Sequence, residues 1–336
     1  MRKLLKNLNK YTIALSALSA AALTNADILT SVRPLGFIAS SIADGITETQ
    51  VLIPAGASPH DYSMKPSDAK RVRDAEFVLW IGKDIDAFLE KSIAQRDATS
   101  VLTISKLAGI ESLLGETSAH DHDHDHDHDH DHDHDHDHDH DHDHDHDHDH
   151  DHDHDHDHHH STNELEQDWH VWFSPKISEQ VAEQLAQQLT QLYPQHQAKI
   201  ATNLETFKQQ LTTTNQQITQ QLAEFKDQGF YVFHDAYRYF ENAYGLQQTG
   251  YFTINPLIAP GAKKLAKIKE EINEHKVKCL FAEPQFTPKV LQTLQQSTNV
   301  KIGQLDPMGE KIALGKGSYS AFLQQIADNF AQCLQE

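Results

Sequence analysis

The chain has 336 residues, with 28 basic and 50 acidic side chains and a formal net charge of -22. Residues 120–160 hold 19 of the aspartates and 22 of the 27 histidines. The rest of the chain has 31 acidic and 28 basic side chains and is therefore nearly neutral. This balance argues against a nucleic-acid-binding surface. Roughly 270 residues outside the segment and the N-terminal leader are enough for two domains of ordinary size.

The N-terminus predicts a signal peptide over residues 1–26. Four basic residues lie among the first ten, and an apolar stretch follows from about residue 11 to residue 23. This stretch is too short to span a bilayer, and the small residues before Asp27 predict cleavage after Ala26. An uncleaved anchoring helix is the alternative. Because no later segment resembles a membrane span, we expect an exported protein without a membrane anchor.

The first part of the mature chain alternates short apolar strands with helical patterns. Such strands are typical of a parallel sheet that helices cover on both faces. Pro34 and Gly36 are expected to break the chain before the first helix, and Ser67 is expected to cap the second. The expected strands are 28–32, 51–53, 77–80 and 101–104, and the expected helices are about 38–42 and 68–75.

The tract from His120 to His160, within an expected loop over 116–164, alternates histidine and aspartate as far as His158 and ends in two further histidines. Every side chain is polar, so neither face of a strand could be buried, and we expect disorder. Imidazoles with neighbouring carboxylates bind zinc, copper and nickel. We expect several loosely held ions, because each binding mode must first order a mobile segment. An expression tag and a functionless expansion are the alternatives.

Two helices are expected after this histidine tract. The first runs from Ser174-Pro175 to about Tyr193, and the second follows Pro194 and extends to about Phe225. Apolar residues of the second helix recur every three, four or seven positions and form one continuous stripe. Its length of roughly 45 Å exceeds what one small domain needs, so we assign 194–226 to a stiff linker helix between two lobes. A coiled coil is the alternative.

The alternation of strands and helices then resumes. A second sheet is expected from strands 231–233, 251–254, 277–282 and 300–305, with helices over 235–244, 263–275 and about 319–334. The predicted fold class is therefore α/β, with two lobes that each contain a mainly parallel sheet flanked by helices. The N-terminal lobe spans 27–193 and the C-terminal lobe spans 227–336, joined by the linker helix, with a cleft between the lobes.

The chain contains two cysteines, Cys279 and Cys333. In an exported protein two cysteines can form one disulfide in an oxidising compartment. Cys279 ends a likely turn into a strand and Cys333 lies in the last predicted helix, so we predict a bridge that pins the C-terminus to its lobe. Two buried free thiols are the alternative.

Four potential metal ligands lie near predicted strand ends: His60, His170, His234 and Asp306. In open parallel sheets, ligands bind outside the carboxyl ends of the strands, so two facing sheets would bring these loops to one cleft. A single histidine at a strand end is more often a hydrogen-bonded core residue. Only five histidines lie outside the tract, however, and three of them fall in these loops. Three imidazoles with a carboxylate or a water molecule form a tetrahedral zinc shell.

A set of motifs in this order resembles the periplasmic zinc-binding proteins of ABC importers across essentially the whole mature chain. The motifs are Leu35-Gly36-Phe37-Ile38, Ser58-Pro59-His60-Asp61-Tyr62-Ser63, Asp168-Trp169-His170-Val171-Trp172, Phe233-His234-Asp235-Ala236-Tyr237, Phe281-Ala282-Glu283-Pro284-Gln285-Phe286 and Leu305-Asp306-Pro307. The resemblance implies two lobes joined by a rigid long helix, with the metal between the lobes and a histidine-rich loop on the N-terminal lobe.

By this resemblance His60, His170 and His234 match the three histidine ligands of the family, and Asp306 matches the position of a carboxylate ligand. Manganese-binding relatives have a glutamate where this chain has His234, so the resemblance favours zinc. Some zinc-binding relatives have an acidic residue directly before the first histidine, whereas this chain has Pro59. A water molecule therefore competes with Asp306 for the fourth position.

Glu283, also at a predicted strand end, is a candidate to contact the metal or a ligating imidazole, with a purely structural hydrogen bond as the alternative. The expected function is capture of Zn(II) in a periplasm of the Gram-negative type by a monomer. The expected partners are an inner-membrane ABC permease and its cytoplasmic ATPase. A periplasmic zinc buffer is one alternative. A zinc hydrolase with Glu283 as its base is another, although no His-Glu-x-x-His pattern is present.

Overall fold

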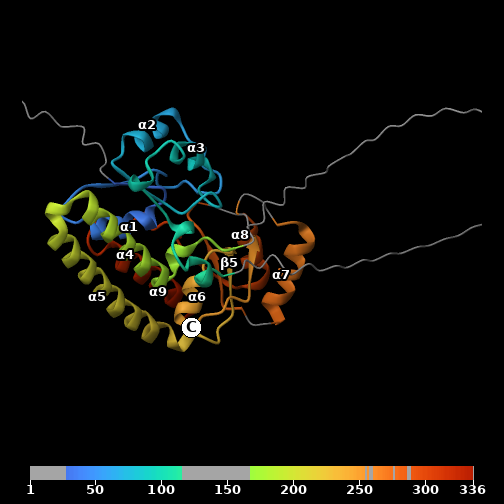
Figure 1. Ribbon diagram of the computed structural model, residues 1–336. Helices are drawn as coiled ribbons and strands as arrows, with labels where there is room; N and C mark the ends of the chain where they lie inside the picture. The colour runs from blue at the N-terminus through green and yellow to red at the C-terminus, as the bar shows by residue number, and fades with distance from the viewer. Residues whose placement is uncertain are drawn as a thin grey trace, which may run out of the picture.

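The computed structural model describes residues 28–115, 167–253, 256, 260–274, 277–285 and 289–335. These residues contain two four-stranded sheets whose strands are all parallel. Helices flank both sheets, and one long helix runs along the side of the molecule (Figure 1). The predicted fold class is thereby confirmed. The predicted signal peptide and the histidine tract lie outside the described residues.

The first sheet has the strand order β2-β1-β3-β4. Its strands are β1 (Ile28–Thr30), β2 (Thr49–Val51), β3 (Phe77–Trp80) and β4 (Val101–Thr103). The helices of this part are α1 (Arg33–Ile42), α2 (Pro66–Asp74), α3 (Glu90–Ile93) and α4 (Pro175–Leu192). Strands β1 and β3 are buried along their whole length and mainly apolar, as expected for central strands with helices on both faces.

The second sheet repeats this topology with the order β6-β5-β7-β8. Its strands are β5 (Phe230–His234), β6 (Gly250–Thr253), β7 (Cys279–Ala282) and β8 (Lys301–Gln304). The helices are α6 (Arg238–Tyr244), α7 (Ala262–Glu274), α8 (Lys289–Thr298) and α9 (Ser318–Leu334). The strand order changes direction between β5 and β7, and ligands bind at the carboxyl ends of such a pair.

Two local predictions at the helix starts are wrong. Pro34 and Gly36 do not break the chain, because α1 already begins at Arg33. A proline in the first turn costs no hydrogen bond, since the N–H groups there have no acceptor within the helix. The glycine packs closely, and a Cβ built on it would approach Val51 Cγ2 to 2.8 Å. Ser67 is no cap either, because α2 begins at Pro66.

The long helix is present, with a short 3-10 turn at each end. Helix α5 covers Gln197–Leu222, preceded by the turn Pro194–His196 and followed by the turn Ala223–Phe225. Its 26 residues span about 39 Å at 1.5 Å each. One face is buried, with Ile200, Phe207, Leu211, Ile218 and Leu222 among its residues.

Helix α5 packs against α1 and α4 of the N-terminal part and against α6 and α9 of the C-terminal part. The C-terminal helix α9 also contacts α1, and Figure 1 shows α9 beside α5. The largest hydrophobic cluster contains residues of both sheets and of all these helices, from Ile28 to Leu334. Because this core is shared, separating the two parts would expose apolar surface, which favours small tilts over a wide opening.

The predicted disulfide is confirmed. Cys279, at the start of β7, is bonded to Cys333 in α9, and their Cα atoms are 6.0 Å apart. The bond ties the last helix to the centre of the second sheet.

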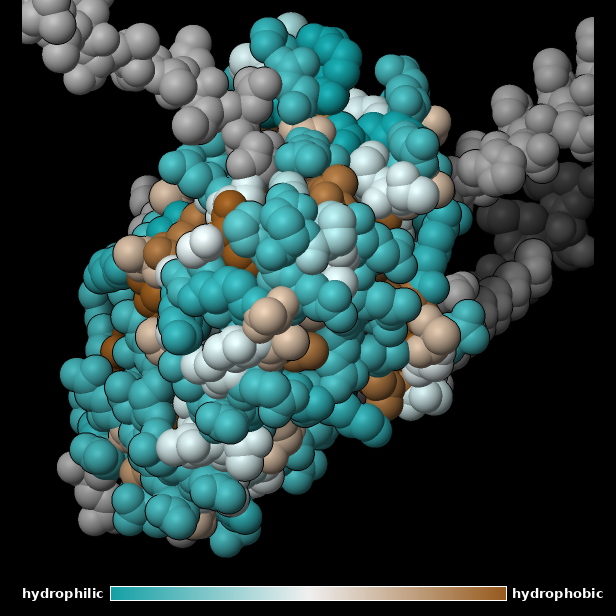
Figure 2. Space-filling view, turned by 60° about the vertical axis from the view of Figure 1, so that its left-hand side comes forward, coloured by the Kyte–Doolittle hydropathy of each residue, from teal (hydrophilic) through white to brown (hydrophobic). Residues whose placement is uncertain are grey.

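The surface seen in Figure 2 is mainly hydrophilic, with hydrophobic residues in small separate groups. None of the described helices has both the length and the hydropathy that a membrane crossing requires.

Candidate metal centre

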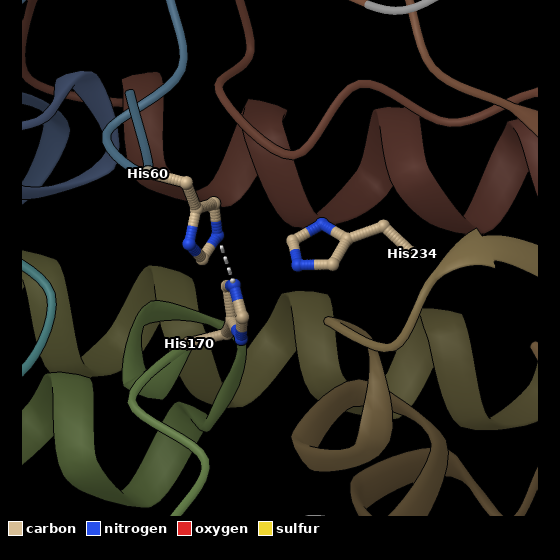
Figure 3. Close-up of side chains that lie close together, drawn as sticks. All are labelled: His60, His170 and His234. Carbon is tan, nitrogen blue, oxygen red and sulfur yellow. Dashed lines mark hydrogen bonds between the residues drawn. The ribbon is translucent and has the colours of Figure 1, made fainter. Parts of the chain in front are cut away.

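Three histidines from separate parts of the chain converge on one point. His60 lies in the loop after β2, His170 directly precedes the turn Val171–Phe173, and His234 is the last residue of β5. The ring centroids are 5.4 Å apart for His60 and His170, 4.9 Å for His60 and His234, and 4.7 Å for His170 and His234. The three rings face a common centre in Figure 3. The structure therefore brings together all three predicted histidines.

The spacing of the imidazole nitrogens suits a tetrahedral ion. One nitrogen from each ring lies within 4.8 Å of the other two. His60 Nε2 and His170 Nε2 are 3.3 Å apart, drawn as the dashed line in Figure 3. Two nitrogens that each lie about 2.0–2.1 Å from a tetrahedral zinc ion are separated by about 3.3–3.4 Å. The cavity lined by the three rings measures about 10 Å³, which is room for one ion or water molecule.

Burial keeps two of these rings in the form that binds metal. Burial lowers the pKa of His60 well below its ordinary 6.5, and the neighbouring His234 and His170 lower it further. The pKa of His234 is also lowered well below 6.5, mainly by burial and then by His170. Neither ring nitrogen of His234 has a hydrogen-bond partner among the described residues. A buried polar atom without a partner is costly, and a cation between the rings would satisfy it.

Asp168 is a functional residue that the sequence analysis did not identify. Its Oδ1 accepts a hydrogen bond from the backbone N–H of His170 at 2.9 Å and lies 2.7 Å from the ring Nδ1 of the same histidine. A carboxylate on Nδ1 fixes the ring and leaves Nε2 to bind the ion. The spacing of Asp168 and His170 could have identified it, because the side chain of an aspartate can accept a hydrogen bond from the backbone N–H two residues later in a turn.

We expect Asp168→Asn to weaken zinc binding by roughly tenfold to a hundredfold, the usual effect of losing such a partner. The amide can donate as well as accept, so it no longer enforces the orientation of the His170 ring. Competition titration of zinc against a chelator measures the change, and Asp97→Asn is a matched control because Asp97 only caps an exposed turn. Equal affinities for Asp168→Asn and the unsubstituted chain would show that Asp168 does not position the ligand.

Glu283 borders the same cavity. It follows β7 directly, and its Oε1 lies 3.6 Å from His234 Nδ1 and accepts a hydrogen bond from the Tyr237 hydroxyl at 3.2 Å. Burial raises its pKa to about 8, an effect that the nearby Asp306 carboxylate adds to and that His170 and the Tyr237 hydroxyl reduce. Its position at the carboxyl ends of β5 and β7 puts it beside the imidazoles, so its predicted contact with a ligating ring stays a prediction that this geometry supports.

Asp306, the predicted fourth ligand, is not part of the group that the three imidazoles form. Its Oδ1 accepts hydrogen bonds from Met308 N at 3.0 Å and Gln285 Nε2 at 3.2 Å, and its Oδ2 accepts one from Glu310 N at 2.7 Å. These contacts make Asp306 the organiser of the turn that follows β8. It would have to give up some of them in order to reach an ion between the rings.

The turn after β8 also links the two lobes. The Oε1 atom of Glu310 accepts hydrogen bonds from Gly56 N, in the loop that carries His60, at 2.6 Å and from Gln285 Nε2 at 2.8 Å. Trp172 Nε1 donates to Pro307 O at 3.1 Å. Asp306 therefore stands next to contacts that hold the loops around the cavity together.

Comparison with known proteins gives a consistent result. The family model described as "Zinc-uptake complex component A periplasmic" matches residues 28–333. The chain is 60% identical over 338 aligned positions to the high-affinity zinc uptake system protein ZnuA of Haemophilus influenzae, with 99% of both chains covered. It is 53% identical to the protein of the same name from Haemophilus ducreyi, covering 97% of this chain and 99% of that protein.

Solved structures with the same fold share less sequence. A crystal structure of ZnuA aligns with a TM-score of 0.70 at 21% identity, covering 92% of this chain and 99% of that chain. The solute-binding protein FpvC from Pseudomonas aeruginosa, in complex with Mn2+, aligns with a TM-score of 0.67 at 20% identity, covering 92% and 98%. At these identities the likeness shows the common fold alone.

Proposed function

Because this chain belongs to the family of periplasmic zinc-uptake components, we propose that it captures one Zn(II) ion on His60, His170 and His234 and delivers it to an importer. The observation that carries this proposal is the convergence of three imidazoles, two of them held neutral by burial, around a cavity of about 10 Å³. Like its relatives, the chain is a transport protein and not an enzyme.

The donor set supports zinc as the cargo. Imidazole suits zinc and its neighbours in the periodic table, whereas manganese and magnesium favour carboxylate and carbonyl oxygen. A water molecule completes the shell in this proposal. Asp306 is the less favourable fourth ligand, because it would have to give up some of its three hydrogen bonds in order to reach the ion, at about 0.5–1.5 kcal/mol each. Glu283 orients His234 in the same scheme and stays next to the ion without binding it.

The partners follow from the family. A component of a zinc uptake system hands its ion to a membrane complex, and we propose an inner-membrane ABC permease with a cytoplasmic ATPase. The predicted signal peptide over 1–26 supports export to a periplasm of the Gram-negative type. In this scheme the tract from His120 to His160 collects zinc ions and holds them loosely, because alternating imidazoles and carboxylates bind several ions without a preformed pocket.

Growth under zinc limitation tests the function. A strain that lacks the gene is expected to grow poorly in medium with a zinc chelator, and the unsubstituted chain should restore growth while a His234→Ala chain should not. If the chain were instead a periplasmic buffer, its loss would harm cells under excess zinc and spare them under scarcity. That pattern would contradict the uptake function.

A further inference from the structure

One tyrosine hydroxyl joins the two lobes next to the metal cavity. Tyr239, in α6 of the C-terminal lobe, accepts a hydrogen bond from Gly115 N at 3.0 Å and donates one to Asp168 O at 2.7 Å. Asp168 N donates to Gly115 O at 3.0 Å, so these three residues form a closed ring of hydrogen bonds. Tyr239 is only 8% exposed, which shields these bonds from competing water.

The Tyr239 hydroxyl forms hydrogen bonds with Gly115 and Asp168, which both belong to the N-terminal lobe. Asp168 also holds the ring of the proposed ligand His170. The main chain of Asp168 binds Tyr239, while its side chain orients the His170 ring. Tyr239 itself lies five residues after His234, at the start of the helix that follows β5. The hydroxyl therefore connects the segment that presents His170 with the segment that presents His234.

Apolar packing reinforces this connection. Helix α6 packs against the turn Val171–Phe173, which directly follows His170. The Phe173 ring lies 5.0 Å from the Tyr237 ring and 6.4 Å from the Phe240 ring, both measured between centroids. Apolar contacts of this kind have little directionality, so hydrogen bonds fix the register of the two lobes. The Tyr239 hydroxyl supplies one such bond, to Asp168, and Trp172 Nε1 supplies another, to Pro307 O.

We propose that Tyr239 is a positioning residue for zinc retention, which holds His170 at a set distance from His234 across the cleft. The inference rests on the proposed capture of zinc by the three histidines. A ligand pair that is already in place before the ion arrives loses less conformational freedom on binding. Without the hydroxyl, Gly115 N and Asp168 O lose their partner and the His170 segment relaxes, so the ion leaves faster.

Release kinetics of the Tyr239→Phe variant test this inference. Phenylalanine keeps the ring and its packing and removes only the hydroxyl. The full chain is loaded with zinc and mixed with excess chelator, so that loosely held ions leave in a fast phase and the ion of the cleft leaves in a slow phase. We expect the slow phase to be roughly threefold to tenfold faster in Tyr239→Phe, which loses the hydrogen bonds with Gly115 N and Asp168 O, with the association rate unchanged.

Tyr244→Phe is the matched control, because Tyr244 lies in the same helix and its hydroxyl donates to Asn215 Oδ1 of α5 at 2.6 Å. Tyr239→Phe loses two hydrogen bonds of α6 and Tyr244→Phe loses one, so thermal unfolding of both metal-free forms should occur at a lower temperature than that of the unsubstituted chain. Only Tyr239→Phe should also alter the visible absorption of bound Co(II), which reports the geometry of the ligands.

Three results would contradict the proposal in different ways. A slow phase equal to that of the unsubstituted chain would overturn the role of Tyr239. Equal acceleration in both variants would overturn it as well, because a general loosening of α6 would then explain the effect. Absence of any slow phase in the unsubstituted chain would instead refute the proposed capture of zinc, and the inference with it.

Discussion

Replacing His234 by alanine is expected to lower the zinc affinity of the cleft by roughly a hundredfold or more. Zinc sites in proteins are worth about 10–16 kcal/mol, and with four ligands each contributes about 3 kcal/mol. His234 is only 3% exposed, and neither of its ring nitrogens has another partner among the described residues. Alanine therefore removes one of the three imidazole donors that lie within reach of one another.

The measurement is a competition titration against a high-affinity chelator in two backgrounds, the full chain and a chain without residues 120–160. The deletion removes 22 histidines and so isolates the tight site. His60→Ala and His170→Ala should behave like His234→Ala. His196→Ala is the control, because His196 lies in the turn before α5 and does not line the cavity. A tight site that survives all three substitutions would mean that the ion binds elsewhere.

Acidification from pH 7 to about pH 5.5 is expected to strip the histidine tract of its ions before the cleft loses its own. A free imidazole has a pKa of about 6.5, so that at pH 5.5 roughly nine in ten such groups carry a proton and cannot bind metal. Burial lowers the pKa of His60 and His234 well below that value. These two rings stay neutral in the same pH range.

Zinc binding weakens as the pH falls, because protons and the metal compete for the same imidazole nitrogen. A lowered pKa means that a proton displaces the ion only at a lower pH, so zinc binding in the cleft should resist acid better than binding in the tract. Zinc content after equilibration and desalting at each pH measures this, with the tract-deleted chain as the control that retains one ion. A single release step, shared by both chains and centred near pH 6.5, would contradict the prediction.

The sequence predicted most of the sheet strands well because their signal is local, but the strand expected over 51–53 lies at 49–51 in the structure. Phe77–Trp80 is a run of four apolar residues that the observed strand matches from end to end. The apolar stripe of α5 likewise predicted its buried face. The starts of α1 and α2 were misplaced for two reasons. A proline in a first turn resembles a break although it costs the helix no hydrogen bond, and the close packing of Gly36 against Val51 exists only in the folded chain.

The sequence by itself determined the chemistry of the site, because only three histidines outside the tract fall at predicted strand ends, and imidazole chemistry selects the ion. It also determined the alternation that builds two parallel sheets. Only the tertiary structure decided which carboxylates serve those imidazoles. Asp306 is engaged by the turn after β8, while Asp168 holds the ring of His170 and Tyr239 binds the main chain of Asp168 from the other lobe. The spacing along the chain allows the local bonds of Asp168 with His170 and of Asp306 with Glu310 N, but the packed fold sets the backbone conformation that forms them and brings Tyr239 to Asp168 across 71 residues, because a hydrogen bond needs its two atoms within about 3 Å.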